Sequence, residues 1–169
     1  MRLIGFPNPV NEKAARAVAA GVLIIASTAL VSGWLWLTLP LALGFLARVA
    51  TGPKLSPLGQ LATRVIAPRL GPPKLVAGPP KRFAQAIGTI VTASSAVAWF
   101  GFGSALAAGV LLAMIIVAAG LEAIFAICLG CIGFAYLMRA GVIPEETCKA
   151  CGDISSRYSR ATAGARLER

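Results

Sequence analysis

The chain of 169 residues contains no histidine and only six acidic residues, and its first long apolar stretch contains no charge at all. Without histidine, no nucleophile can be matched with a general base of the usual hydrolase type. A glycine-rich phosphate-binding loop is also missing. These absences leave no motif for hydrolysis or nucleotide binding.

Charged residues are scarce throughout the chain. They make up 13% of the sequence, while 57% is hydrophobic and the mean hydropathy is +0.80. A soluble domain of this size needs a more charged surface, whereas lipid solvates apolar side chains. We therefore predict a polytopic membrane protein without a separate soluble domain.

The N-terminal apolar stretch does not fit a secretory signal peptide. It runs from Ala17 to Ala47 without a charge, whereas the apolar core of a signal peptide has about 7–15 residues. No cleavage site of the A-x-A type follows it at the expected distance. We therefore interpret this stretch as part of the mature membrane domain.

The charges that are present are mostly positive, with a formal net charge of +10. In a soluble protein this excess would suggest nucleic-acid binding. Here the cations flank apolar stretches, so they indicate membrane orientation and contact with anionic lipids, chiefly along residues 48–82. We predict the lipid bilayer as a partner and no nucleic acid.

The apolar stretches predict four transmembrane helices in two hairpins. Ala17 to Ala47 is too long for one crossing of about 20 residues, and Gly33 and Pro40 favour a turn within it. A partly re-entrant second limb is the alternative. From Ala105 to Met138 a single helix would measure ~50 Å, so it either protrudes from the membrane or bends at Gly120, Gly130 or Gly133.

The predicted fold class is an all-α polytopic membrane protein with four transmembrane helices, a short interfacial helix and a cytoplasmic tail. Residues 1–140 form the membrane domain and residues 141–169 the tail. A basic, proline-rich loop covers residues 51–82. The four spans are 14–33, 36–50, 83–101 and 105–127, the last with a helical extension to 138.

Local signals refine two of these segments. Asn11 can cap a helix that starts near Glu12. Ser56 followed by Pro57 is a helix start, and the apolar residues after it recur on one face. This pattern predicts a short amphipathic helix in the headgroup plane, with a solvated basic loop as the alternative.

The distribution of cations predicts the topology. All sixteen lie in the leader, the middle loop or the C-terminal segment, and none lies in the two turns near Trp34 and Gly101. With four crossings these three segments share one side, which the positive-inside rule makes cytoplasmic. The tryptophans Trp34, Trp36 and Trp99 fall at the opposite ends of the spans, as in an aromatic belt.

Four cysteines are the main candidate functional residues. Cys128 and Cys131 lie in the run ICLGCIGF, late in the last apolar stretch, and Cys148 and Cys151 lie in the polar run ETCKACGD. At helical spacing, each pair shares a face. Depth along the helix places the first pair at the cytoplasmic interface, where Gly141 lets the tail fold back so that four thiols meet.

Three hypotheses account for these cysteines. The spacing fits a four-cysteine zinc or iron site, although the run CLGC lies in a helical pattern rather than an exposed turn. Dithiol chemistry is the second, with Lys149 and Arg139 favouring the thiolate. Buried cysteines acting as small apolar residues are the third.

Glu122 is a carboxylate inside a predicted span and is a functional candidate by default. Gln85 and Thr89 are expected at similar depth and could donate hydrogen bonds to it. A proton acceptor for thiol chemistry is one interpretation. An interfacial glutamate that reaches toward water or pairs with Arg82 is the other.

Three runs carry a resemblance to a known family: RVIAPRLGPP from Arg64, KRFAQAIG from Lys81, and LEAIFAICLGC from Leu121. Together they resemble the bacterial membrane-protein family called domain of unknown function 4395, over most of the chain to about Tyr136. The resemblance implies a four-span bundle in the bacterial inner membrane and gene neighbours of thioredoxin-like or sulfurtransferase type. The tail with Cys148 and Cys151 resembles an extension found in an actinobacterial subset.

The sequence thus predicts a membrane protein whose cytoplasmic cysteines exchange electrons or sulfur with a thioredoxin-like or sulfurtransferase protein. Cys128 and Cys131 would be the primary pair, with Cys148 and Cys151 resolving or relaying. The alternative is a non-enzymatic scaffold or subunit of a membrane complex, held by structural zinc on the same four cysteines. A transporter, which would need to oligomerise, is a third hypothesis.

Overall fold

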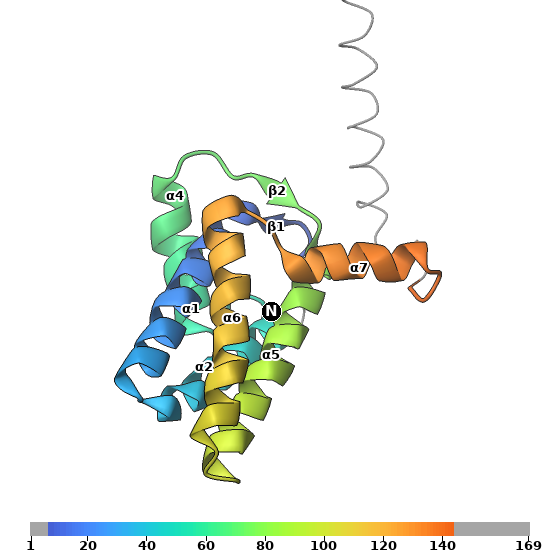
Figure 1. Cartoon of the computed structure of the whole chain (residues 1–169). Helices are drawn as coiled ribbons and strands as arrows, with labels where there is room; N and C mark the ends of the chain where they lie inside the picture. Colours follow the sequence, from blue (N-terminus) through green and yellow to red (C-terminus); the bar gives the residue numbers. More distant parts are fainter. Residues whose placement is uncertain (1–6, 144–169) are drawn as a thin grey trace, which may run out of the picture.

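The computed structural model describes residues 7–143, and three long helices dominate it (Figure 1). These are α1 (Glu12–Ser32), α5 (Gly78–Phe100) and α6 (Ala105–Phe125), and each is long and apolar enough to cross a membrane. A short 3₁₀ turn (Leu35–Leu37) leads into α2 (Thr38–Thr51), which packs along α5 while α1 packs along α6. With 14 residues, α2 is shorter than the roughly 20 that span a bilayer core.

Helix starts follow the local signals in two places. The side chain of Asn11 accepts the backbone N–H of Lys13 at 3.0 Å, which confirms the predicted cap of α1. Ser56 accepts the N–H of Gly59 at 3.2 Å, and Pro57 opens α3 (Pro57–Leu61). Pro40 does not interrupt α2, because it lies in the first turn, where the backbone N–H groups have no intrahelical partner.

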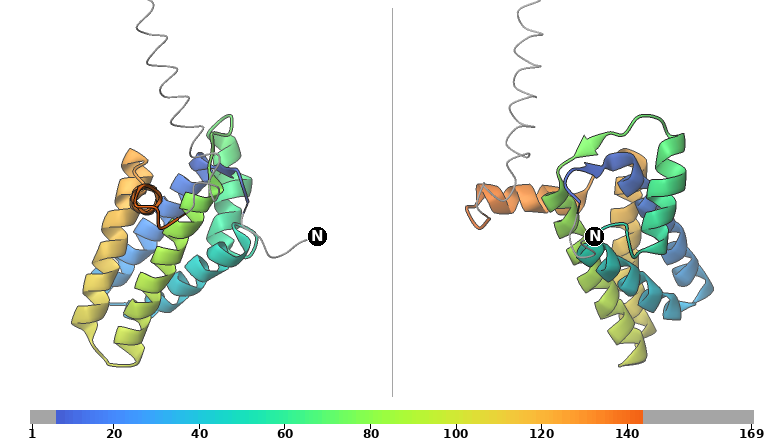
Figure 2. Two further views of the ribbon diagram at one scale, coloured as in Figure 1. Left: turned by 90° about the vertical axis from the view of Figure 1, so that its right-hand side faces the viewer. Right: turned by 180° about the vertical axis from the view of Figure 1, so that it is seen from behind.

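The helix after Ser56 does not lie across the bundle as the amphipathic pattern suggested. It continues from α3 through a π-helical turn (Ala62–Ile66) into α4 (Ala67–Arg69) and stands alongside α1 (Figures 1 and 2). Ala62 and Ala67 are buried, and Leu58 packs against the main core. Packing against α1 therefore decides the direction of this helix.

A two-stranded antiparallel ribbon departs from the all-α prediction. Strand β1 (Val10–Asn11) pairs with β2 (Leu75–Val76), with Val10 opposite Val76. Beside it Glu12 forms a 2.8 Å salt bridge with Lys74. The ribbon ties the N-terminal leader to the end of the basic loop, because Asn11 pairs with Leu75, 64 residues later in the chain.

Small and hydroxylated residues bring the long helices together. Ala26, Ala29 and Ala108 are fully buried, as are Thr92 and Ser95 of α5. The Ser95 hydroxyl donates to the backbone carbonyl of Ala108 on α6 at 2.9 Å. Such contacts are typical of helix packing in lipid, where small residues allow close approach.

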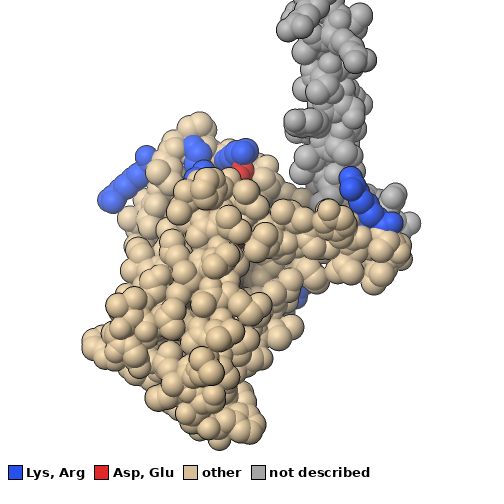
Figure 3. Space-filling view, in the orientation of Figure 1, with Lys and Arg blue, Asp and Glu red and all other residues tan. Residues whose placement is uncertain are grey.

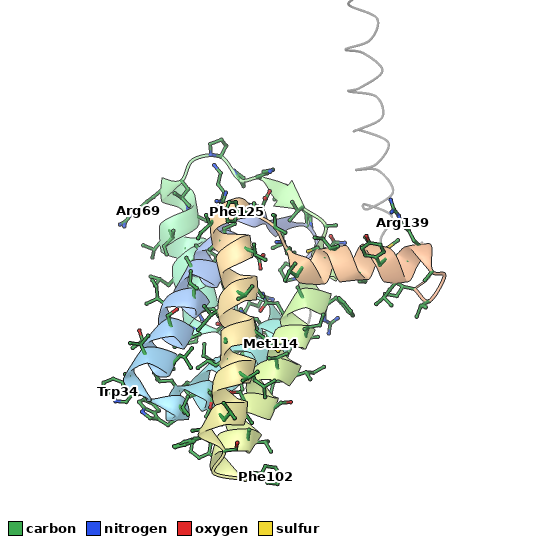
Figure 4. The ribbon with its side chains drawn as sticks, viewed as in Figure 1. Trp34, Arg69, Phe102, Met114, Phe125 and Arg139 are labelled. Carbon is green, nitrogen blue, oxygen red and sulfur yellow. The ribbon has the colours of Figure 1, made fainter. Side chains whose placement is uncertain are left out.

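The outward faces of the long helices are apolar, as expected for a membrane protein. Large exposed side chains occur on each of them, including Ile24, Val31, Ile90, Leu106 and Val117. The visible lysines and arginines gather at one end of the molecule, near α4, the β-ribbon and α7 (Figure 3). Trp34 and Phe102 lie at the opposite end (Figure 4), in agreement with the predicted separation of cations from the two turns.

The last apolar stretch bends, which was one of the two predicted alternatives, but at Ala126 and not at one of the three glycines. Helix α6 ends at Phe125, Ala126 adopts a left-handed conformation with φ of 59°, and α7 (Leu129–Arg139) then projects sideways from the bundle, roughly perpendicular to the long helices (Figures 1 and 2). The predicted extension to residue 138 is therefore helical but forms a separate helix, and the alternative of one straight, protruding helix is wrong. The guanidinium of Arg16 donates to the carbonyls of Ala123 and Ile124 at 3.0–3.2 Å, which satisfies the exposed end of α6.

Gly130 lets α7 approach α5 closely. A Cβ built at Gly130 would lie 2.5 Å from the Cα and Cβ of Ala84. The same two helices also meet through the aromatic rings of Phe83 on α5 and Phe134 on α7, whose centroids are 5.7 Å apart. The glycine of the CLGC run therefore has a packing role.

We predict that Gly130→Ala lowers the free energy of unfolding by about 1–3 kcal/mol, because the added methyl group forces α7 away from α5. Denaturant unfolding in detergent micelles measures this change. Gly133→Ala is the matched control on the same helix, since its Cβ would lie 3.9 Å from Phe83. Equal destabilisation by both variants would contradict the packing role.

Candidate functional site: the cysteine pair at the start of α7

Cys128 occupies the N-cap of α7, and Cys131 lies one turn later. The Cys128 sulfur accepts the backbone N–H of Cys131 at 3.3 Å, and the two sulfurs are 2.7 Å apart. The sequence predicted both residues within a helical pattern, whereas Cys128 lies just before the helix, at its N-cap. The sulfurs nevertheless meet, because the N-cap side chain folds over the first turn of the helix.

The surroundings of the two thiols differ. The hydrogen bond from Cys131, the positive charge of Lys81 and the Cys131 backbone N–H lower the pKa of Cys128, although burial and Glu122 oppose this shift. The same hydrogen bond, together with burial and the charge of Cys128, raises the pKa of Cys131. Cys128 is therefore the residue that ionises first.

Glu122 pairs with Lys81, a partner that the sequence did not suggest. The Lys81 Nζ and Glu122 Oε1 atoms are 2.6 Å apart, and the two side chains are only 10% and 16% exposed. Lys81 is in the first turns of α5, which starts at Gly78 rather than near Phe83. Lys81 therefore lies within the helix and is buried. In the sequence this lysine served only to indicate the membrane orientation, whereas the structure makes it part of the site.

The residues predicted as partners of Glu122 bond elsewhere. Gln85 accepts a hydrogen bond from Arg48 at 2.8 Å, and Thr89 donates to the backbone carbonyl of Gln85. Arg82 donates to the carbonyl of Val49. Gln85, Thr89 and Arg82 were therefore the wrong partners for Glu122, whose partner is Lys81.

Cys128 and Glu122 share the wall of a cavity of about 270 Å³ within the bundle. Gln85 is the third polar side chain on its wall, and the remaining lining is apolar or glycine, mostly from α1, α5 and α6. Cys128 is 8% exposed, whereas Cys131 is more accessible from outside. The two sulfurs therefore face different surroundings.

Cys148 and Cys151 lie outside the described residues. Within residues 7–143, Cys128 and Cys131 supply two of the four predicted metal ligands, and no group of three candidate ligand side chains comes together there. The described geometry accordingly defines a dithiol, with Lys81 and Glu122 as its charged neighbours.

We predict opposite effects of two substitutions on the pKa of Cys128. Lys81→Met should raise it, because this change removes a positive charge and leaves the Glu122 carboxylate unpaired. Glu122→Gln should lower it, because the opposing negative charge is lost. The pH dependence of alkylation by iodoacetamide, followed at Cys128 by mass spectrometry, measures both shifts.

Lys74→Met is the control for these variants. It removes the exposed lysine that pairs with Glu12 and should leave the alkylation profile unchanged. Shifts in the same direction for the Lys81 and Glu122 variants would show that the charges do not act on the sulfur as assigned.

Comparison with known proteins adds a family but no described activity. No curated protein and no solved structure matches the chain. A family model described as Domain of unknown function (DUF4395) matches residues 10–139, from β1 to the end of α7. This match includes the CLGC run, ends before Cys148, and covers most of the chain: the protein belongs to the DUF4395 family.

Proposed function

We propose that the protein is a membrane-bound dithiol that exchanges electrons with a soluble thioredoxin-like protein. The observation that carries this proposal is the position of Cys128 at the N-cap of α7, with its sulfur 2.7 Å from that of Cys131. A thiolate at a helix start and a second thiol within reach are the elements of a reversible disulfide. Helices α1, α5 and α6 anchor the pair to lipid.

The exchange proceeds in two balanced steps. A thiolate of the reduced partner attacks the more accessible Cys131 sulfur of the Cys128–Cys131 disulfide, and Cys128 leaves as the stabilised thiolate. The second partner thiolate then attacks the partner's own sulfur in the mixed disulfide and releases Cys131. The partner thereby becomes a disulfide, while two electrons and, after protonation, two protons pass to the pair.

Other predicted residues have roles within this proposal. Cys148 and Cys151 would resolve or relay disulfides, and Glu122 would accept a proton from a thiol of the pair. In the sulfur-relay form, the Cys128 thiolate attacks the outer sulfur of a sulfurtransferase persulfide, and the donor thiolate leaves. A zinc-bound scaffold remains the competing hypothesis, and metal content distinguishes it.

We predict that Cys128→Ser accumulates a mixed disulfide between Cys131 and an oxidised partner, because in the reverse direction of the exchange Cys128 is the thiolate that attacks the Cys131 sulfur and releases the partner. Non-reducing electrophoresis after acid quenching and alkylation of cells measures this species. Cys131→Ser, which removes the accessible sulfur, should trap far less. The double variant Cys148→Ser, Cys151→Ser distinguishes a relay role for the tail.

Two results would contradict the redox proposal. One is a pair of thiols that stays fully reduced and unmodified in cells under oxidising and reducing growth conditions. The other is stoichiometric zinc in the purified protein that persists after thiol-blocking treatment, which would favour the scaffold.

We also propose that the cation-bearing end faces the cytoplasm of a bacterial inner membrane, following the positive-inside rule. A fluorescent protein that matures only in the cytoplasm should therefore be bright when fused after Arg169. A periplasm-specific reporter should be active when inserted after Gly103, in the turn between α5 and α6. The reverse pattern would overturn this orientation and place the dithiol in the periplasm.

A further inference from the structure

Arg48, near the end of α2, is a buried cation without a salt bridge in the described part of the chain. It is only 5% exposed. Its Nε donates to Gln85 at 2.8 Å and its Nη1 to Ser56 at 3.1 Å, and its guanidinium lies 4.4 Å from the ring centroid of Phe45. These partners are neutral, whereas buried charges are normally paired.

One nitrogen of this guanidinium remains available. Arg48 Nη2 is buried and has no hydrogen-bond partner among residues 7–143. Because Gln85, Ser56 and Phe45 hold the other parts of the group, its orientation is set before any ligand arrives. A fixed guanidinium with an unused donor suits a carboxylate, phosphate or sulfate oxygen.

Arg48 also lines a cavity of about 220 Å³, distinct from the one beside Cys128. Lys81, Asn11, Thr63 and Gln85 contribute the other hydrogen-bonding side chains of its wall, and leader residues from Pro7 onward close one side. The volume compares with roughly 30 Å³ for one water molecule in the liquid. The cavity therefore has room for a small polyatomic ion with its waters.

The charges around this cavity do not balance. Arg48 and Lys81 contribute two positive charges, and Glu122, which pairs with Lys81, contributes one negative charge. Glu122 attracts Arg48 electrostatically, but its 2.6 Å salt bridge is to Lys81. Among residues 7–143, the charged side chains at Arg48, Lys81 and Glu122 therefore sum to one positive charge.

We propose that the cavity between Arg48 and Lys81 binds a small oxyanion of the phosphate or sulfate class, either free or as a lipid headgroup. Arg48 Nη2 donates a charge-assisted hydrogen bond to the anion, and Lys81 contributes a second positive charge. The site lies at the cation-bearing end of the bundle. The proposal does not rest on the dithiol proposal, because no step of binding involves Cys128 or Cys131, and Lys81 is the one charged residue that belongs to both sites.

The test measures the melting temperature of the full-length protein in an uncharged detergent. Sodium phosphate and sodium sulfate should raise it saturably by several degrees, and sodium chloride at the same ionic strength should not. A second arm titrates phosphatidylglycerol into the micelles. Saturation by inorganic ions indicates a free anion, whereas a response to the lipid alone indicates a headgroup.

Two substitutions test the role of Arg48. Arg48→Lys keeps the charge but loses the forked donors, and it should weaken anion binding by about tenfold. Arg64→Lys is the matched control on an exposed arginine outside the cavity and should bind as the wild type does.

Gln85→Glu supplies a carboxylate beside Arg48 without changing the side-chain shape. It should raise the melting temperature without added anion and reduce the response to phosphate. A wild-type protein that responds to phosphate, sulfate and lipid no more than to chloride would overturn the proposal. So would an unchanged phosphate response in Gln85→Glu, which keeps the test decisive if Arg48→Lys does not fold.

Discussion

The satisfaction of the carbonyl groups at the end of α6 is the constraint on which the cysteine site depends. The last turn of a helix leaves up to four carbonyls without intrahelical partners, and these need donors from elsewhere. Arg16 donates to two of these carbonyls, and the N–H groups of Ala126 and Ile127 bond back to Glu122 and Leu121. Because these bonds end α6 at Phe125, Cys128 begins a new helix.

The chemistry of the sulfur pair follows from this new start. In the interior of a helix, the N–H of Cys131 would bond to the carbonyl four residues before it and would be unavailable to a side chain. At the start of α7 it bonds instead to the Cys128 sulfur. Gly130 then allows α7 to pack on α5, whose first turns carry Lys81. The Cys128 sulfur is thus affected by the start of α7, by the packing of α7 on α5 and by the charge of Lys81.

Two of the cations at the cation-bearing end of the bundle are buried, so they contribute to the interior of the protein as well as to its orientation in the membrane. Lys81 and Arg48 are both nearly excluded from solvent, and Gln85 lines both the cavity beside Cys128 and the cavity beside Arg48. The Lys81–Glu122 pair contributes one side chain to each cavity. The Lys81–Glu122 pair and Gln85 therefore separate the two cavities and belong to the walls of both.

Properties that depend on near neighbours or on sums along the chain could be predicted from the sequence. These include the membrane class, the family, the Asn11 cap, the Ser56–Pro57 helix start and the separation of cations from the two turns. The end of α6 could not be predicted. The left-handed residue there is Ala126 rather than the glycine that usually marks a helix end, and Arg16, which bonds the last carbonyls, lies 107 residues from Ala123. The partner of Glu122 and the direction of the helix after Ser56 also required the structure. Hydrogen-bond donors, ion-pair partners and packing faces are chosen by distance in space, which the order of residues alone does not specify.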